Sequence, residues 1–378
     1  MVIREGRGVN TTAIEWTDYT WNPVTGCTPV SEGCRNCYAR RMAQRLRGRF
    51  GYPADDPFRV TLHADRLGQP FYEARGKRIF VCSMGDLFHP DVPDDFLDEV
   101  FFPMYVLNVD RVFIVLTKRP ERMRDYLSRK PPLPPTVWPG VSVENQAAAD
   151  ERIPILLDIL AAVRVVSVEP MLGLVDLHNF LRGFTCPSCG RGIPADRFCW
   201  APDECGDPTV EHVTCQYCGA GTSDTCRCSS CEEQSTCTRE EECDRHNQVF
   251  KYEEFCAKSP IGWVICGGET GPGARPMHPN WVRDLRDQCQ AAGVAFYFKS
   301  WGEWAPAGWV HADSQGALVR PDGHVCRDRA ELAPSHNCEM VHVGRKRAGR
   351  LLDGRTWDEY PGGQRTCDAT LASKASSS

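Results

Sequence analysis

Short apolar runs alternate along most of the chain with segments whose apolar residues recur at helical spacing. The runs predict strands buried on both faces, and the spaced segments predict helices that cover those faces. Strands separated by helices in this way lie parallel in one sheet. The predicted strands are residues 78–84, 111–118, 136–143, 164–170, 262–269 and 294–301, and the predicted helices are residues 94–107, 120–129, 146–160 and 279–293.

Helix start and stop signals agree with these boundaries, because Pro120 stands at a predicted helix start and Gly293 at a predicted helix end. A further strand near residues 12–19 brings the pattern to about seven strand–helix units. We therefore predict an α/β protein with a full or partial (β/α) barrel of the TIM type. A short open parallel sheet is the alternative.

Polar residues end nearly every predicted strand. In a barrel and in an open sheet alike, the carboxyl ends of the strands form the site. A purely structural barrel does not need polar residues at successive ends, so the pattern predicts a catalytic mouth. These ends are Cys82-Ser83-Met84-Gly85-Asp86, Thr117-Lys118-Arg119, Ser142-Val143-Glu144-Asn145, Ser167-Val168-Glu169-Pro170, Gly267-Gly268-Glu269-Thr270 and Lys299-Ser300-Trp301.

The composition is that of an ordinary globular protein, with 378 residues of which 42% are hydrophobic and 25% charged. Neither an N-terminal signal segment nor an apolar run long enough to span a membrane is present in the sequence. We therefore expect a cytoplasmic protein without membrane contact. In a reducing compartment, its 21 cysteines indicate metal ligation rather than disulfides.

The cysteines concentrate in an acidic insert between the fifth and sixth strands. Twelve of the 21 lie between Cys186 and Cys256, and residues 184–256 carry 14 Asp and Glu against 6 Lys and Arg. The chain is therefore expected to divide into a first part of the barrel, a cysteine-rich insert, the last barrel units, a loop-rich extension and a disordered tail. Their ranges are 1–183, 184–258, 259–301, 302–366 and 367–378.

Three cysteines outside the insert, Cys27, Cys34 and Cys37, are spaced C-x6-C-x2-C just before a predicted helix. Three thiolates on one loop can hold three irons of a [4Fe–4S] cluster and leave the fourth iron open to a ligand. A structural zinc with Cys82 or His89 as its fourth ligand is the alternative, and unligated thiols are another.

The insert contains two C-x2-C-G knuckles, which are typical of a zinc ribbon. A second set has C-x2-C and C-x2-H spacing, and an auxiliary iron–sulfur cluster remains the alternative to zinc. The insert has few large apolar residues, so we expect it to need metal for folding. It would serve either to dock substrate or only to stabilise a long loop through bound metal. The predicted ligands are Cys186, Cys189, Cys215, Cys218, Cys228, Cys231, Cys243 and His246.

Several motifs in order resemble a phage-associated, radical-SAM-like family (DUF5131 type) recognised by a three-cysteine motif. They are IEWTDYTWNPVTGC, GCRNCYA, IFVCSMGDLFH, FIVLTKRPERM, WPGVSVEN, SVEPMLG, WVICGGETGPGARPMHPNWVRDLRDQC and FYFKSWGEW. The resemblance covers most of the chain except the insert. It implies a radical SAM barrel in which Cys27, Cys34 and Cys37 ligate a [4Fe–4S] cluster. S-adenosylmethionine would bind the open iron and, after one-electron reduction, yield a 5′-deoxyadenosyl radical.

Two features depart from the usual radical SAM pattern. The first cysteine gap is six residues rather than three, with Asn36 in place of an aromatic residue, and the GGE element follows the sixth strand rather than the second. Cys82 and Cys266 are either hydrogen-atom donors or small buried hydrophobes. The candidate residues for binding the cofactor or the substrate are Ser83, Asp86, Glu144, Glu169, Gly267, Gly268 and Glu269.

The resemblance implies a DNA or modified nucleotide substrate, a reducing electron donor and, if the protein is phage-encoded, the host cytoplasm. Relatives linked to thymidine hypermodification suggest an isomerase that converts N-linked glycinyl-thymidine into a C-linked form. A radical SAM enzyme acting on a small nucleotide or peptide and a non-catalytic zinc protein are the alternatives. Contacts with nucleic acid would come from two basic stretches, namely Arg40, Arg41, Arg45, Arg47 and Arg49, and Arg345, Lys346, Arg347, Arg350 and Arg355.

Overall fold

The structure is a computed structural model that describes residues 10–12, 14–72, 77–107, 111–181, 261–307, 316–320, 325–326 and 338–361. The cysteine-rich insert lies outside the described residues. The predicted ligands Cys186, Cys189, Cys215, Cys218, Cys228, Cys231, Cys243 and His246 therefore remain predictions.

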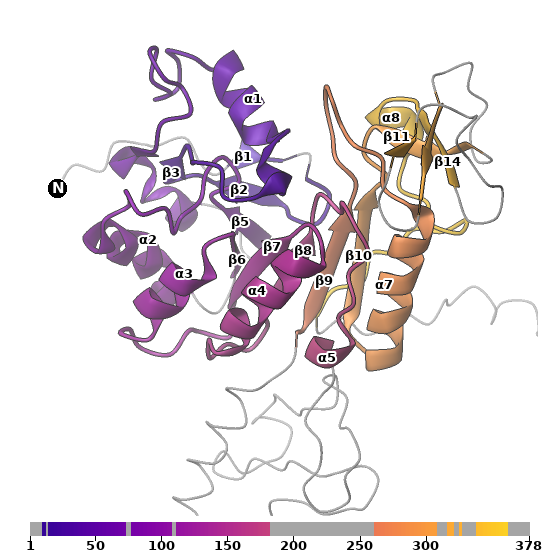
Figure 1. Cartoon of the computed structure of the whole chain (residues 1–378). Coiled ribbons are helices and arrows are strands. Elements are labelled where there is room, and N and C mark those ends of the chain that lie inside the picture. The colour runs from indigo at the N-terminus through magenta and orange to yellow at the C-terminus, as the bar shows by residue number, and fades with distance from the viewer. Residues whose placement is uncertain are drawn as a thin grey trace, which may run out of the picture.

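The described residues form one eight-stranded sheet in the order β1-β2-β5-β6-β7-β8-β9-β10. Only β1 is antiparallel to its neighbour, so the other seven strands make a parallel sheet that curls into a half-barrel (Figure 1). The predicted α/β fold is confirmed in its partial-barrel form. The strands are β1 (Asn10–Thr11), β2 (Tyr19–Trp21), β5 (Lys77–Val81), β6 (Arg111–Thr117), β7 (Val137–Val143), β8 (Val165–Val168), β9 (Trp263–Gly267) and β10 (Ala295–Ser300).

Alternate residues of these strands enter two different apolar clusters. Residues such as Val115 and Val264 pack in the cluster that includes the helix residues Leu97, Met123 and Trp281. Their neighbours along the strands form a second cluster on the opposite face, within which the Trp263 ring lies 6.0 Å from both the Trp16 and the Trp138 rings. Large aromatic side chains thus fill the inner face of a sheet that does not close on itself.

The helices start and end where the sequence provides a stop or a cap. Pro120 occupies the first turn of α3, and the Asn145 side chain caps α4 by accepting a hydrogen bond from Ala148 N at 3.0 Å. Gly293, with φ +70°, ends α7 in the left-handed conformation. The helices are α1 (Tyr38–Arg45), α2 (Asp94–Val106), α3 (Pro120–Leu127), α4 (Gln146–Leu157), α5 (His178–Leu181), α7 (Pro279–Ala292) and α8 (Arg345–Ala348).

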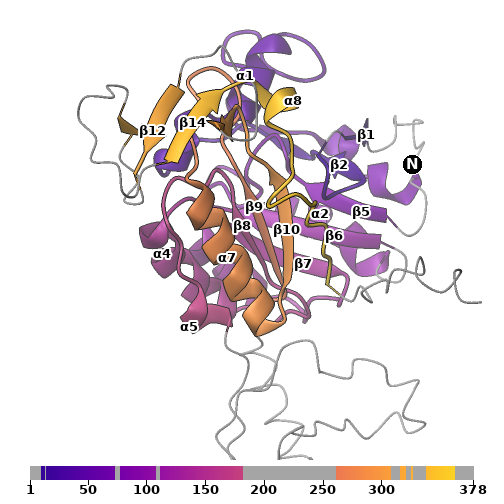
Figure 2. The same cartoon turned by 90° about the vertical axis from the view of Figure 1, so that its right-hand side faces the viewer.

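The C-terminal segment, which we expected to be loop-rich, contains short strands. Its described part forms an antiparallel sheet in the order β11-β14-β12-β13, seen at one side of the carboxyl edge of the main sheet (Figure 2). These strands are too short to give a periodic sequence signal. Their bounds are β11 (Trp304–Pro306), β12 (Gly316–Val319), β13 (Val325–Cys326) and β14 (Cys338–His342).

A small hairpin-like pair, β3 (Val24–Thr25) and β4 (Thr61–Leu62), lies between β2 and β5 in the chain and frames the segment that carries the three cysteines. Short 3-10 turns at Glu32–Cys34, Ala64–Arg66 and Gln69–Tyr72 complete this region. Within the described ranges, none of the helices has the length and apolar character needed to cross a bilayer.

Candidate functional site

A cavity of about 260 Å³ opens at the carboxyl edge of the half-barrel. Ligand sites in proteins commonly have about 300–1,000 Å³, so this cavity is slightly smaller than that range. Its wall combines the segment between β3 and α1 with the ends of the strands from β5 to β10. Cys27, Cys34 and Cys37 all line it.

The cysteine segment begins with a tight contact to the rest of the chain. Gly26 has φ +86°, and a Cβ at this position would lie 2.2 Å from the carbonyl oxygen of Arg59. Its own N–H donates to the Met84 carbonyl at 3.0 Å, immediately after β5. Only glycine fits this close approach. The start of the cysteine segment is therefore fixed against the end of β5.

The other end of the segment is fixed to the loop after β9. Asn36 Nδ2 donates to Glu269 Oε2 at 2.9 Å and to the Gly273 carbonyl at 2.8 Å. Arg275 forms ion pairs with Glu269 at 2.6 Å and with Glu32 at 2.8 Å. Although burial acts to raise the pKa of Glu269, hydrogen bonds from Arg275 and Asn36 lower it. The predicted cofactor ligand Glu269 thus clamps the cysteine segment, and the unusual residue Asn36 is one half of that clamp.

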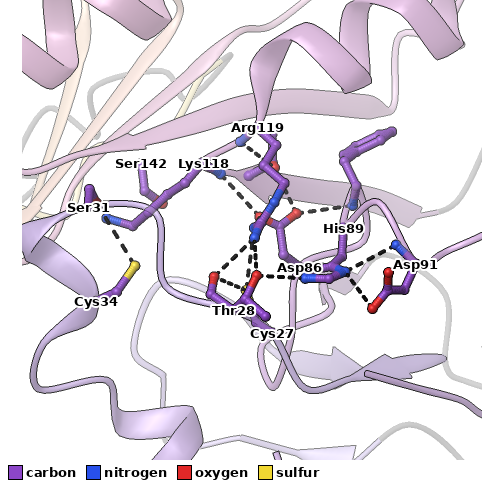
Figure 3. Close-up of polar contacts among 12 residues, drawn as sticks. Cys27, Thr28, Ser31, Cys34, Asp86, His89, Asp91, Lys118, Arg119 and Ser142 are labelled. Carbon is purple, nitrogen blue, oxygen red and sulfur yellow. Dashed lines mark hydrogen bonds and ion pairs between the residues drawn. The ribbon is translucent and has the colours of Figure 1, made fainter. Parts of the chain in front are cut away.

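Arg119 connects the first cysteine to the strand ends (Figure 3). Its Nη1 donates to Cys27 Sγ at 3.4 Å and to Asp86 Oδ2 at 2.8 Å, and its Nη2 donates to the Thr28 carbonyl at 3.0 Å. Burial, and then the charge of Asp86, raise the pKa of Cys27 to about 11, although Arg119 acts in the opposite direction. Asp86 also accepts a hydrogen bond from Thr117 Oγ1 at 2.7 Å. The predicted site residue Asp86 therefore holds Arg119 against the cysteine segment.

A second ion pair lies beside Cys34. Lys118 Nζ is 2.8 Å from Glu144 Oε2, and a Cβ at Gly33 would lie 2.8 Å from the same Nζ atom. Arg152 also contacts Glu144, at 3.2 Å, from α4. Burial acts to raise the pKa of Glu144, but Lys118 lowers it below its usual value. Glu144 does not line the cavity, and these two cations form ion pairs with it.

The chemistry of Cys34 differs from that of Cys27. Burial acts to raise the pKa of Cys34, but hydrogen bonds from the backbone of Val30 and Ser31 and the charge of Lys118 lower it overall. The Ser31 hydroxyl lies 3.9 Å from Cys34 Sγ (Figure 3). Two neighbouring cations, Lys118 and Arg119, therefore face two of the three thiols and favour their thiolate forms.

The far side of the cavity carries a third pair. Lys299 Nζ is 3.0 Å from Glu169 Oε1, and Ser167 Oγ lies 3.4 Å from Glu169 Oε2. All three residues line the cavity. A Cβ at Gly267 would lie 2.6 Å from Glu169 Oε1, so Gly267 makes room for this carboxylate without lining the cavity itself.

The remaining candidates divide between the cavity and the core. Ser83, Gly268 and Cys82 line the cavity, and burial raises the pKa of Cys82 to about 12, so this thiol is neutral. Cys266 is fully buried on β9, where its thiol lies 3.7 Å from Met171 Sδ, and it does not line the cavity. His89, the other candidate for a fourth ligand, has both ring nitrogens in hydrogen bonds, with Thr28 and with Asp91 N.

Trp16, Phe80 and Leu116 form an apolar floor that the sequence did not single out. The Trp16 and Phe80 rings lie 4.7 Å apart. Trp16 is 1% exposed, and its indole Nε1 has no hydrogen-bond partner among the described residues. A buried N–H without a partner is costly, which marks this donor as one that a ligand acceptor would satisfy. Three polar residues of the cavity wall were recognised in the sequence only as residues at strand ends, namely Ser142, Lys118 and Lys299.

The described residues contain no group of three or more His, Cys, Asp or Glu side chains arranged to hold a metal ion. The three thiols share a cavity without forming such a group. This arrangement does not suit a single tetrahedral ion, whose ligands converge at about 2.3 Å from one centre. A cubane cluster offers a separate iron to each thiolate, and three half-buried thiols around one cavity fit that donor set.

Comparison with known proteins gives a family but no characterised relative. A comparison with curated proteins finds no match. Among solved structures, a mutant of spore photoproduct lyase with dinucleoside spore photoproduct is similar at 12% sequence identity and a TM-score of 0.32. The match covers 44% of this chain and 49% of that one, so the chain spans about half the length of the lyase. This similarity is too low to carry an argument.

The family model described as "Protein of unknown function (DUF5131)" matches residues 11–361. The match includes the half-barrel, the cysteine segment and the strands of the C-terminal sheet. The chain therefore belongs to the DUF5131 family.

Proposed function

We propose that this protein is a radical S-adenosylmethionine enzyme whose [4Fe–4S] cluster is held by Cys27, Cys34 and Cys37. The observation that carries the proposal is that all three cysteines line one cavity at the carboxyl edge of a parallel half-barrel. The sequence resemblance to radical-SAM-like proteins supports the same assignment. When bound, the cluster and its cofactor would supply hydrogen-atom abstraction from carbon, which amino-acid side chains cannot perform.

The chain itself supplies the setting for this chemistry. The Asn36–Glu269 clamp and the Arg119–Asp86 pair hold the cysteine segment at both ends. We assign no fourth ligand to the chain, because both His89 ring nitrogens are engaged in hydrogen bonds and the Cys82 thiol is buried, whereas the other three cysteines are only half-buried. This leaves three protein ligands and an open position for the cofactor.

The substrate that we propose is a nucleobase in DNA. The floor of the cavity supports this class, since the half-buried Phe80 ring provides flat apolar surface and Trp16 adds an N–H without a partner among the described residues, for a carbonyl or ring-nitrogen acceptor. Isomerisation of an N-linked glycinyl-thymidine to its C-linked form is the reaction that we propose to test first. The bond changes in it involve a carbon whose hydrogen is not acidic, so a radical route suits it.

Iron content tests the cluster. Anaerobically reconstituted wild-type protein is expected to bind about four irons per chain and to absorb near 400 nm, as expected for a [4Fe–4S] centre. Cys27→Ala, Cys34→Ala and Cys37→Ala should each lose most of the iron and the absorbance. The matched control is Cys289→Ala, which removes a buried thiol on α7 that does not line the cavity. Zinc without iron in the wild type, or full iron in the three variants, would overturn the proposal.

Product formation tests the reaction. Reduced wild-type protein with S-adenosylmethionine should release 5′-deoxyadenosine, and the release should rise when DNA bearing glycinyl-thymidine is added. Unmodified DNA and free modified nucleoside serve as separate arms. A rise with the free nucleoside alone would replace the DNA substrate by a small nucleotide, and an absence of 5′-deoxyadenosine from iron-loaded protein would contradict the radical assignment.

A further inference from the structure

A basic surface surrounds α1 at the edge of the cavity. Six arginines occur between Arg35 and Arg49, and no Asp or Glu lies between residues 35 and 54, although the whole chain has a net charge of −6. We call this region the arginine surface. Its members are Arg35, Arg40, Arg41, Arg45, Arg47 and Arg49.

Within the part of the chain that the structure describes, no carboxylate neutralises the positive charge of the arginine surface. Arg47 donates to the Ala54 carbonyl at 2.7 Å and Arg49 donates to the Arg45 carbonyl, so both bond to neutral groups. Arg41 likewise donates to the Thr270 carbonyl. No carboxylate of the described residues forms an ion pair with any of the six, whereas arginines elsewhere, such as Arg275, are paired. Five of the six side chains are exposed, Arg41 being the exception.

An exposed aromatic residue lies within this surface. Phe50 is 64% exposed and has φ +52°, a conformation that bulky residues rarely adopt. The neighbouring glycines, Gly48 and Gly51, also have positive φ, so the turn holds Phe50 outward. Strained backbone that presents an apolar ring to water points to a binding role. Single-stranded nucleic acid binds to surfaces that combine arginines with an exposed aromatic ring. The arginines pair with the phosphates, and a base stacks on the ring.

The arginine surface is continuous with the cavity. Cys37, Tyr38 and Ala39, in the first turn of α1, line the cavity, and the rest of α1 extends from it at the top of the molecule (Figures 1 and 2). A strand lying along α1 would therefore pass the cavity mouth. Tyr38 and Met42 add exposed apolar surface on the same helix, at 42% and 38% exposure.

We infer that the arginine surface binds a single strand of nucleic acid through its phosphates, with one base stacked on Phe50. This inference deepens the proposed function. It rests on the proposed nucleic-acid substrate but does not require the proposed cluster. Binding can therefore be measured on metal-free protein, while iron content reports separately on the three cysteines.

The test is anisotropy of a fluorescein-labelled 20-nucleotide single-stranded DNA, titrated with the full chain between about 50 and 200 mM salt, where phosphate contacts dominate. The triple variant Arg35→Gln, Arg45→Gln and Arg49→Gln should reduce the slope of log affinity against log salt by about 2, at about 0.7 per phosphate contact. Phe50→Ala should weaken binding about fivefold or more with an unchanged slope, because stacking releases no counterions.

The matched control neutralises three cations away from the cavity, Arg124→Gln, Arg129→Gln and Lys130→Gln, and should bind DNA as the wild type does. Equal affinity and slope in the triple variant and this control would overturn the inference. Binding to phosphatidylserine vesicles without binding to the DNA would also overturn it, because the partner would then be a membrane surface. Retained DNA binding by a protein that fails to bind iron would leave the inference standing and refute only the radical assignment.

Discussion

The guanidinium of Arg119 lies 3.4 Å from the Cys27 sulfur and donates a hydrogen bond to it, while the same Nη1 atom donates to Asp86 at 2.8 Å. Arg119 and Asp86 are both nearly buried, with side-chain exposures of 12% and 8%. One ion pair therefore joins a strand end, a helix start and a thiol. Because Arg119 is a guanidinium with several donors, lysine cannot reproduce this set of bonds.

Replacing only one partner of the Arg119–Asp86 ion pair should lower the free energy of unfolding more than replacing both partners. Arg119→Met leaves Asp86 buried without its cation, and we expect the free energy of unfolding to fall by about 3–5 kcal/mol. The double variant Arg119→Met, Asp86→Asn should lose less than the sum of the two single losses, with a coupling of at least about 0.5 kcal/mol. Urea denaturation of the wild type, the two single variants and the double variant gives the coupling energy as a double-mutant cycle. Strict additivity would show that the pair does not act as a unit.

The hydrogen bond to the sulfur predicts a separate electronic effect. In iron-loaded Arg119→Met, iron content should stay near the wild-type value, because Arg119 is not a ligand. The reduction potential should become more negative, since a hydrogen bond to a ligating sulfur stabilises the reduced cluster. Arg122→Met is the control, because Arg122 lies on α3, which begins directly after Arg119, and bonds to Val92 and Asp94 but not to a thiol. An unchanged potential in Arg119→Met would contradict the prediction.

Glu144 should make the fold sensitive to acid. Burial acts to raise its pKa, but Lys118 and Arg152 lower it, so the folded pKa lies below the unfolded one. The ionised carboxylate therefore stabilises the fold above a pH of about 4.3, and this stabilisation is lost as the pH falls through the folded pKa. Glu144→Gln should lower the free energy of unfolding by about 3–5 kcal/mol at pH 7, because two cations lose their partner.

The measurement for Glu144 is denaturant unfolding at pH 7 and at pH 4. The difference in free energy of unfolding between wild type and Glu144→Gln should narrow at pH 4, because the carboxylate of the unfolded wild type, with its ordinary pKa of about 4.3, is then mostly protonated. Glu151→Gln is the control, since Glu151 is largely exposed and its ion pair with Arg152 is long, at 3.9 Å. An equal loss at both pH values would assign the effect of Glu144→Gln to packing rather than to charge.

The sequence predicted which residues stand at the carboxyl edge better than it predicted what they do. Periodicity located the strands, so Asp86, Glu169 and Lys299 were expected at one edge of the sheet, and they line one cavity. Glu144 was expected there too, but it pairs with Lys118 and Arg152 away from the cavity. A carboxylate at a strand end does not reveal whether a neighbouring strand or helix will supply a cation.

Contacts between distant residues were the part that the sequence could not supply. Asn36 and Glu269 are 233 positions apart, and each was interpreted separately, one as a departure from a motif and the other as a cofactor ligand. The pattern also left the choice between a full and a partial barrel open. Trp138, Trp263 and Tyr297 were recognised only as strand residues, and their packing across the inner face depends on how the sheet curls.

Glycine substitutions should separate steric clash from backbone strain. At Gly302, with φ +77°, a Cβ would lie 2.1 Å from the Glu269 carbonyl oxygen, so Gly302→Ala suffers both effects. At Gly354, with φ +82°, no atom lies within 4 Å, so Gly354→Ala suffers strain alone, about 1–2 kcal/mol. Gly68→Ala has neither problem and should be nearly neutral. Thermal unfolding should rank the losses in that order, and a Gly302→Ala protein as stable as Gly354→Ala would refute the close approach.

The unpaired indole of Trp16 gives a test of the cavity floor. Trp16→Phe removes an N–H that has no partner among the described residues, so its loss of stability should come only from the cavity that the smaller ring leaves. Trp138→Phe is the matched control. It leaves a similar cavity but also removes an N–H that donates to the Pro135 carbonyl at 3.0 Å, so it should lose about 1 kcal/mol more than Trp16→Phe. Trp138 does not line the cavity, so Trp138→Phe should keep substrate turnover. Under the proposed function, Trp16→Phe should instead lower kcat/KM for 5′-deoxyadenosine release by about two- to tenfold, which is the value of one hydrogen bond. Wild-type turnover in Trp16→Phe would mean that no ligand acceptor meets this donor.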